Sequence, residues 1–243
     1  DPFDRDAGSG VDFNMYEAFQ QNNVEMTTVG PYKDRPSLLE KIYRKGHRLF
    51  SRKLTAKFSE AYLHYCARIV DETAERVKPD AIFTHNLIPL VYSRSKIPVI
   101  YKTDAILSNM HEQWPSYSRF EYYRMLGWER KALNRSNLIV TVSHWAYEAL
   151  LEDYHIPNSR IVVMPIPSSL PADVIPQQMD AKTISPDDLR LLSVAKDFNM
   201  KGIDISIAAT KMLREKGINA QLRVVGQDGE NSDGVEFMGL YKK

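Results

Sequence analysis

Short, continuously apolar runs alternate with longer stretches of helical period along the first two thirds of the chain. The strand-like runs lie at 24–30, 81–86, 98–105, 137–143 and 160–166. Apolar residues recur at helical spacing at 11–23, roughly 37–77, 118–136 and 144–154. Buried apolar strands separated by helices are typical of a parallel sheet that is covered on both faces. We therefore predict a doubly wound α/β fold.

Residues 165–188 interrupt this alternation, because five of the chain's 13 prolines fall there without visible period. The pattern then restarts, with strand-like runs at 189–195, 220–226 and 235–239 and a helical run at 203–217. We predict a Rossmann-like domain at 1–168, a linker at 169–188 and part of a second Rossmann-like domain at 189–243. The first domain lacks the expected opening strand and the second is short. The sequence therefore resembles a fragment that is truncated at both ends, more severely at the C-terminus.

Composition narrows the class of protein further. The net charge of +1 gives no argument for a nucleic-acid partner, and no apolar run approaches the length of a membrane span. The chain opens with the acidic DPFDRD rather than with a secretory signal. The single cysteine, Cys66, excludes an internal disulfide and is expected to pack inside a helix. A cytoplasmic location and no nucleic-acid partner are expected.

The stretch SVAKDFNMKGID, residues 193–204, joins a strand-like run to a helical run. Ligands of open α/β sheets bind at the carboxyl ends of the strands, which is where Lys196 and Lys201 lie. Gly202 opens the helix, so the two cations and the helix N-terminus could hold one diphosphate. From spacing alone, two solvated surface lysines explain the pattern equally well.

A second glycine-rich turn, Gly8-Ser9-Gly10, precedes the first helical stretch. Its amides could approach an anion at the helix N-terminus. The turn does not continue as a dinucleotide fingerprint, since Phe13 stands where the third glycine would be, and no Walker lysine follows. A plain helix-capping turn is the alternative.

Three strand ends in the first domain carry polar residues. His85 could carry a proton or bind a sugar hydroxyl, or it could cap the next helix. Asp104 could bind hydroxyl groups or cap a turn. Ser143 is predicted to cap the following helix, and Trp145 is predicted to anchor the core. No Ser/His/Asp triad, metal-ligand cluster or RNA-binding signature is present.

Residues 41–57, KIYRKGHRLFSRKLTAK, hold seven lysines and arginines, no acidic residue and an apolar stripe. A basic amphipathic segment could lie on an anionic membrane surface or meet an anionic acceptor. An ordinary surface helix with a solvated basic face is the alternative.

Three stretches together resemble family 4 retaining glycosyltransferases, which have the GT-B fold. LRLLSVAKDFNMKGIDISIAATKMLREKGINAQLRVVG is similar to the strand–turn–helix–strand passage of the family's donor domain. ERKALNRSNLIVTVSHWAYEALLEDYHIPNSRIVVMPIP resembles the end of its first domain, and DPFDRDAGSGVDFNMYEAFQQNNVEMTTVGP resembles its N-terminal loop and helix. The three stretches cover about half of the chain and follow the family's order.

The resemblance implies transfer of a sugar from a UDP- or GDP-sugar to a sugar or lipid-linked acceptor, in polysaccharide or glycolipid biosynthesis. It implies that Lys196 and Lys201 bind the donor diphosphate, that Gly226 lines the nucleotide site, and that Gly8–Gly10 approach the donor across the cleft between the domains. Asp104 and His85 are predicted, from their places at strand ends, to lie at the same donor–acceptor cleft. The resemblance implies retention of anomeric configuration without a metal or other cofactor, the nucleotide-sugar being a substrate. A location at the membrane surface would suit residues 41–57.

The chain departs from the family pattern at five places. Lys196 replaces an arginine, Ala195 replaces a glycine, and Thr103 stands where the family has a strand-end histidine. PIPSS, residues 165–169, replaces a glycine-containing turn. The family's acidic motif with two glutamates would lie beyond Lys243, so no catalytic residue is assigned and the fragment itself could be inactive. A non-catalytic sugar-nucleotide-binding or scaffold protein, or a GT-B sugar-nucleotide epimerase, are the alternatives.

Overall fold

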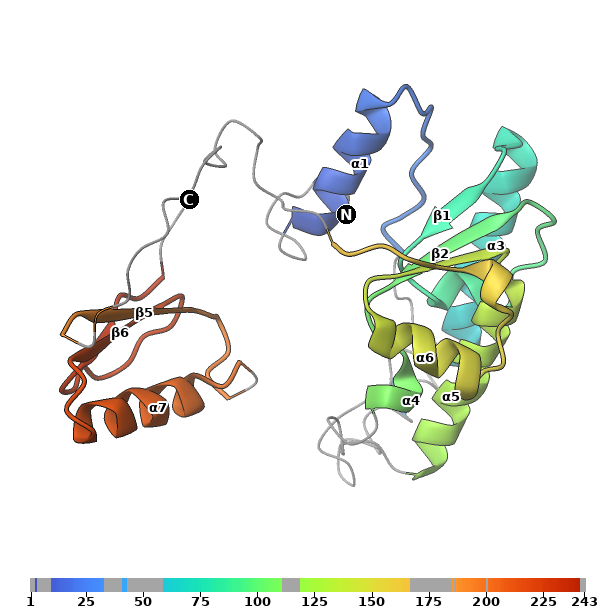
Figure 1. Cartoon of the computed structure of the whole chain (residues 1–243). Coiled ribbons are helices and arrows are strands. Elements are labelled where there is room, and N and C mark those ends of the chain that lie inside the picture. Colours follow the sequence, from blue (N-terminus) through green and yellow to red (C-terminus); the bar gives the residue numbers. More distant parts are fainter. Residues whose placement is uncertain are drawn as a thin grey trace. The chain divides into compact units, whose positions relative to one another are not determined.

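The computed structural model describes residues 3, 10–32, 41–42, 59–110, 119–166, 185, 187–199 and 201–240. The chain divides into two compact units, Asp1–Ala172 and Asp173–Lys243 (Figure 1). Each unit contains one parallel sheet with helices packed on it. Two such units in succession are the components of the GT-B fold that the resemblance implies.

The first unit is built on a four-stranded sheet in the order β1-β2-β3-β4. Its strands are β1 (Ile82–Thr84), β2 (Val99–Thr103), β3 (Leu138–Thr141) and β4 (Ile161–Val163). All neighbouring pairs are parallel, and Thr103 is in register with Thr141. Four of the predicted strand-like runs therefore form strands, and the predicted α/β class is confirmed.

Helices α3 (Glu60–Val77), α5 (Arg119–Arg135) and α6 (His144–Glu152) contribute to the main core of this unit. Short helical turns η3 (Ile88–Leu90), α4 (Leu107–Met110) and η4 (Asn158–Arg160) complete the connections. Alternate strand residues meet these helices, so one face of the sheet is fully covered. Fully buried members of this core include Leu63, Val99, Leu133, Ile139 and Leu150.

Helix α1 (Val11–Gln21) packs against the edge strand β1. The ring centroids of Phe19 and Phe83 lie 5.1 Å apart at 70°, an edge-to-face contact of the favourable kind. Asp12, in the first turn of α1, contacts His85, directly after β1. The N-terminal end of α1 therefore lies at the carboxyl edge of the sheet.

Two expectations for the first unit were wrong. Residues 24–30 form no strand, because they pair with no strand among the described residues and Val24 is 46% exposed. Trp145 is 43% exposed, because α6 turns Ala146, Ala149 and Leu150 inward instead. Cys66 is fully buried in α3, as predicted.

The long helical region expected at 37–77 is described only in part. α3 begins at Glu60, where the Ser59 hydroxyl accepts from the Tyr62 amide at 3.2 Å. Lys41 and Ile42 are helical and exposed, and the rest of the basic segment 41–57 lies outside the described residues. None of the described helices has the length and apolar character that a membrane crossing requires.

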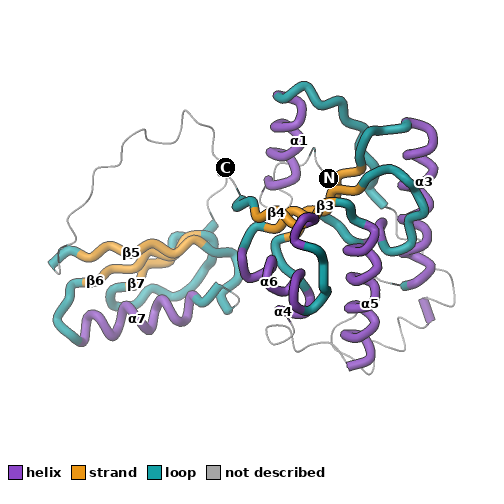
Figure 2. Tube along the Cα trace, turned by 45° about the vertical axis from the view of Figure 1, so that its right-hand side comes forward, coloured by secondary structure: helices purple, strands orange, loops and turns teal. Residues whose placement is uncertain are grey.

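The second unit has a three-stranded parallel sheet in the order β5-β6-β7. Its strands are β5 (Leu189–Val194), β6 (Ala220–Val225) and β7 (Val235–Phe237), and helix α7 (Ile203–Glu215) covers one face (Figure 2). The core between them contains Ile203, Leu222, Val224 and Val235. The opposite face carries Arg190, Leu192, Val194 and Arg223, all exposed, so the described residues of this unit cover its sheet on one face only.

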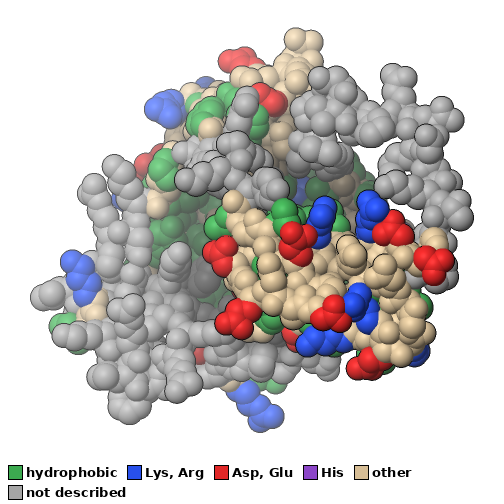
Figure 3. All heavy atoms as spheres, turned by 90° about the vertical axis from the view of Figure 1, so that its left-hand side faces the viewer, with side chains coloured by type: hydrophobic (Ala, Val, Ile, Leu, Met, Phe, Trp, Pro, Cys, Tyr) green, Lys and Arg blue, Asp and Glu red, His purple; other side chains and the backbone are tan. Residues whose placement is uncertain are grey.

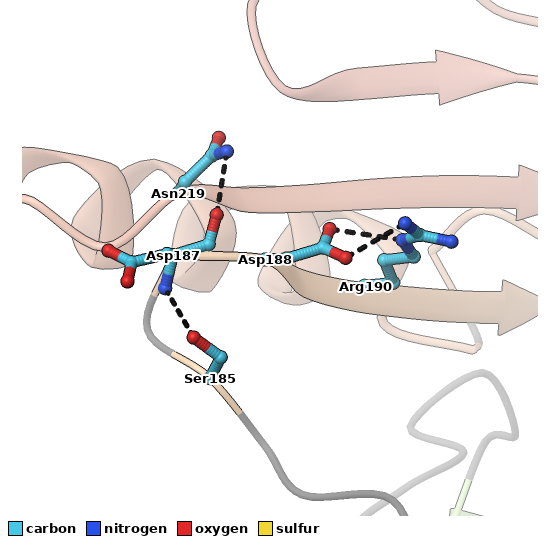
Figure 4. Close-up of polar contacts among 5 residues, drawn as sticks. All are labelled: Ser185, Asp187, Asp188, Arg190 and Asn219. Atoms are coloured by element: carbon cyan, nitrogen blue, oxygen red, sulfur yellow. Dashed lines mark hydrogen bonds and ion pairs between the residues drawn. The ribbon is translucent and has the colours of Figure 1, made fainter.

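Polar contacts fix the amino ends of β5 and β6 (Figure 4). Arg190 donates through Nε and Nη2 to both carboxylate oxygens of Asp188, at 3.0 and 2.8 Å. The Asn219 side chain donates to the Asp187 carbonyl at 3.0 Å, and the Asp187 amide donates to the Ser185 hydroxyl at 3.2 Å. These contacts set where β5 starts beside β6.

Candidate functional site

The turn between β5 and α7 is compact and closed by its own backbone. The Lys201 amide donates to the Asp197 carbonyl at 3.2 Å, and the Ile203 amide donates to the Phe198 carbonyl at 3.0 Å. Gly202, the residue that precedes α7, has φ 66°, a conformation that glycine adopts without strain. The sequence therefore folds into the strand–turn–helix that was predicted around Gly202.

Lys196 and Lys201 are both exposed on this turn. Neither forms an ion pair with another residue that the structure describes. No side chain caps the N-terminus of α7, so the positive end of its dipole is not covered by a capping group. The turn thus combines two unpaired cations with an uncapped helix start, and their predicted binding of one diphosphate stays a prediction.

Gly226, which follows β6, lies directly against the start of that turn. Its φ is 96°, and a Cβ atom at this position would lie 2.8 Å from the Ala195 carbonyl oxygen. The Ala195 amide donates to Val225, and the Gly226 amide donates to Gly239 after β7, both in the range of normal hydrogen bonds at 2.9 and 2.8 Å. The carboxyl ends of all three strands are therefore joined, with Gly226 between them.

The carboxyl edge of the second sheet is not uniformly basic. Asp197 lies in the β5–α7 turn, Asp204 in the first turn of α7, and Asp228 in the loop after β6. On the face of this unit drawn in Figure 3, acidic side chains lie among the basic ones. Selectivity for an anion here would depend on the local placement of Lys196 and Lys201 rather than on a broad positive potential.

Three neighbouring strands of the first sheet each end on a threonine. The hydroxyls of Thr84 and Thr103 donate to the carbonyls two residues on, Asn86 and Ala105, at 3.0 and 2.7 Å. Thr141 is fully buried, and its hydroxyl has no partner among the described residues. The strand ends thus turn away from the sheet at the same level and place His85, Asp104 and Ser143 along one edge.

His85 has a defined partner. Its Nδ1 lies 3.3 Å from Oδ1 of Asp12 on α1. The imidazole therefore lies against the first turn of α1. The side chain of Asn86, and not that of His85, accepts from the Ile88 amide in the following helical turn, at 2.9 Å.

The other predicted residues of this edge are placed as follows. Asp104 is exposed and makes no ion pair with a described residue. Gly10 precedes α1 with φ 77° and is buried, whereas Gly8 and Ser9 lie outside the described residues. Ser143 caps α6, as predicted, by accepting from the Ala146 amide at 3.3 Å. His85 and Asp104 thus follow adjacent strands, and Gly10 precedes the helix whose Asp12 contacts His85.

Sequence reasoning missed two acidic residues of the first unit, Asp12 and Glu129. Asp12 gave no signal beyond its place in a first helical turn. Glu129 lies on α5 and is only 3% exposed, and burial raises the pKa of its carboxyl group to about 7. A signal for Glu129 was present, because its helical phase matches that of the buried Ala132 and Leu133.

No group of three or more His, Cys, Asp or Glu side chains within the described ranges is arranged to hold a metal ion. Two open hollows, of about 730 and 650 Å³, lie near the amino ends of strands, opposite to the edges described above. The first is lined by residues that include Arg214, Asn219 and Asp233, and the second by residues that include Lys96, Arg135 and Arg160. Neither hollow contains a predicted site residue.

Two larger proteins are among the solved structures that the chain resembles. A UDP-N-acetylglucosamine 2-epimerase from Rickettsia bellii is 13% identical with a TM-score of 0.36, over 81% of this chain and 58% of that one. A glycosyltransferase from Rickettsia africae ESF-5 is 11% identical with a TM-score of 0.44, over 93% of this chain and 57% of that one. The chain therefore spans less than two thirds of the length of either protein.

A search of curated proteins finds no match to the chain. The sequence model of Glycosyltransferase Family 4, in contrast, matches residues 13–167, which are well over half of the chain. The match contains nearly all of α1 and the whole of the first sheet, with the strand ends that carry His85 and Asp104. The chain belongs to Glycosyltransferase Family 4.

Proposed function

We propose that this chain is part of a glycosyltransferase that transfers a sugar from a nucleotide-sugar to an acceptor hydroxyl with retention of configuration. The single observation that carries the proposal is the family match over residues 13–167. The first unit would bind the acceptor, and the second would bind the donor. The proposed donor is a UDP-sugar or a GDP-sugar.

The β5–α7 turn supports a donor role for the second unit. Departure of a nucleoside diphosphate leaves negative charge on the leaving oxygens, and cations or helix N-termini that already face it stabilise the transition state. Lys196, Lys201 and the uncapped start of α7 supply such groups without a metal ion. Gly226 keeps the adjacent loop close to the turn, so a nucleotide would have backbone on one side and the two lysines on the other.

The His85–Asp12 pair supports an acceptor role for the first unit. With Nδ1 held by a carboxylate, Nε2 can accept a hydrogen bond from an acceptor hydroxyl and orient that oxygen for attack. Asp104, on the next strand end, can bind a second hydroxyl. The proton of the attacking hydroxyl is proposed to pass to the leaving phosphate.

A thermal-shift screen with UDP, GDP, ADP and their common sugar derivatives tests the donor proposal. A ligand that binds only the native state raises the melting temperature by mass action. We expect one nucleotide class to raise it; no response to any nucleotide, in this chain and in a longer chain of the same protein, would overturn the proposal. Product anomers identified by NMR then test retention.

A non-catalytic sugar-nucleotide-binding protein is the second candidate. It is favoured by Lys196 and Ala195, which replace the arginine and glycine of the family pattern; the Ala195 methyl group is accommodated at 8% exposure. A longer chain that binds the nucleotide-sugar but neither hydrolyses nor transfers it, with a panel of sugar and lipid-linked acceptors, would favour this candidate.

A location in the cytoplasm, at an anionic membrane surface, is proposed from the basic segment 41–57. Most of this segment lies outside the described residues, so the sequence alone supports the proposal. Sedimentation with vesicles of phosphatidylcholine alone and with added phosphatidylserine tests it. Binding that needs the anionic lipid and falls with salt is the expected result.

A further inference from the structure

The loop that follows β2 carries Asp104 and is held at three points. The Thr103 hydroxyl donates to the Ala105 carbonyl at 2.7 Å, which turns the chain at the strand end. The Asn109 side chain donates to the Trp145 carbonyl in α6 at 2.8 Å. Between these contacts, the Leu107 amide donates to both carboxylate oxygens of Glu129, at 3.2 and 3.1 Å.

Glu129 reaches this loop from inside the core. It is 3% exposed on α5, between the buried Trp128 and Ala132. The Tyr154 hydroxyl donates to its Oε2 from the segment after α6. The carboxyl group therefore joins α5, the segment after α6 and the loop of Asp104. The proposed mechanism does not use it.

The surroundings of Glu129 contain few charges that could balance it. Tyr101 from β2, Tyr122 from α5 and Tyr154 interact with it electrostatically. The charges nearest to these groups are Asp104, which acts on Tyr101, and Arg130. The Arg130 guanidinium lies over the Tyr154 ring and donates to the Asp153 carbonyl. No ion pair joins Glu129 to a cation among the described residues.

We propose that Glu129 is a positioning residue that fixes the loop of Asp104 at the carboxyl edge of the first sheet. The loop closes over the carboxyl group through the Leu107 amide, and opening of the loop admits water to it. Asp104, three residues before Leu107, keeps its place at the end of β2 only while this contact is made. The consequence for acceptor binding rests on the proposed function; the contact itself does not.

Protonation of Glu129 is linked to closure of the loop. Burial raises the pKa of its carboxyl group to about 7 in the closed state, from 4.5 in water. The closed loop therefore binds the proton more tightly than the open loop does, and a rise in pH favours opening. If opening hydrated the carboxyl group fully, the open fraction would increase about tenfold between roughly pH 6 and pH 8, and this is the upper limit of the effect.

Hydrogen exchange of the whole chain, followed by mass spectrometry at pH 6, 7 and 8, tests the proposal. We expect the protection of peptides spanning 104–110, corrected for intrinsic exchange, to fall by up to about tenfold over this range, while peptides from β3 stay protected. Glu129→Gln keeps an acceptor for the Leu107 amide and cannot ionise, so its protection should not change with pH. A Glu129→Gln variant with the pH response of the wild type, or equal loss in β3, overturns the proposal.

Two further variants separate positioning from mere folding. Tyr154→Phe removes a hydrogen bond that favours the ionised carboxylate, so the midpoint of the loop response should move to higher pH. Glu129→Ala should lower protection at 104–110 at every pH and spare β3. If Glu129→Ala fails to fold, the comparison of wild type with Glu129→Gln decides.

An activity readout tests the role in catalysis. In a longer chain that transfers sugar, the KM for the acceptor should rise with pH in the wild type and not in Glu129→Gln, while the KM for the donor is the same in both. If the chain transfers sugar but the protection of 104–110 does not depend on pH, the role of Glu129 is refuted. If the protection depends on pH as expected but no sugar is transferred, only the proposed function is refuted.

Discussion

The Nδ1 atom of His85 lies 3.3 Å from Oδ1 of Asp12, so the residue after β1 is oriented by the first turn of α1. Asp12 is the less exposed partner, at 21% against 53% for His85. The imidazole is therefore presented to solvent by a carboxylate behind it. In many enzymes a carboxylate stands behind a histidine in this way, and it fixes the tautomer and the direction of a ring that accepts a proton or a hydrogen bond.

Asp12→Asn should reduce the turnover of a transferring enzyme roughly tenfold, because an amide can hold the imidazole in the wrong tautomer. His85→Gln should reduce it further, by about a hundredfold. Steady-state kinetics with saturating donor measure both effects. Glu25→Gln changes an exposed carboxylate outside α1; it is the control and should leave the turnover unchanged. Equal turnover of Asp12→Asn and the wild type would show that His85 takes no part in the reaction.

Lys201→Ala should weaken binding of the nucleoside diphosphate by about 1.5–3 kcal/mol, or roughly ten- to a hundredfold in Kd. A charge-assisted contact with phosphate is lost, and the remaining lysine cannot replace it. Isothermal titration calorimetry at two salt concentrations measures the change, and affinity for the wild type should fall as salt rises. Lys216→Ala, an exposed lysine at the far end of α7, is the matched control. Unchanged affinity in Lys201→Ala would separate the turn from the donor site.

Gly226→Ala should destabilise the second unit by about 3 kcal/mol. The added Cβ would lie 2.8 Å from a backbone oxygen, which cannot move without displacing β5, and φ is 96°. Gly217→Ala is the control, because Gly217 has φ 82° but open space around its Cβ position, and about 1 kcal/mol is expected there. Hydrogen exchange of β6 peptides reports both values; equal losses would show that backbone strain alone, and not the contact with Ala195, requires glycine.

Much of the fold follows from the pattern of the sequence. The runs that became β1 to β7 are short and apolar, and the helices between them have clear inner faces, as in α5 with Trp128 and Leu133. The run at 24–30 has the same local character and forms no strand, because a strand also needs a neighbour, which local sequence does not specify. Contacts between residues far apart in the sequence could not be predicted either, so the sequence indicated His85 as a site residue but not its partner Asp12. Glu129 was overlooked because a carboxylate in an inward phase conflicts with the usual rule for charged residues.

Stability of the first unit should fall as pH rises from about 5 to 7.5, through Glu129. Its pKa of about 7 in the folded chain exceeds the ordinary value of 4.5, so the folded state holds the proton over an interval in which the unfolded state has released it. The stabilisation is complete below pH 4.5 and lost above about 7, and its full size is on the order of 3 kcal/mol. All three tryptophans lie between residues 114 and 145, so their fluorescence during urea unfolding reports on this unit alone. Other groups titrate in the same range, and the quantity to measure is therefore the wild type minus Glu129→Gln difference at each pH. A difference that stays constant between pH 5 and 8 would mean that Glu129 is hydrated in the folded protein, and the contact with Leu107 could not then hold the loop.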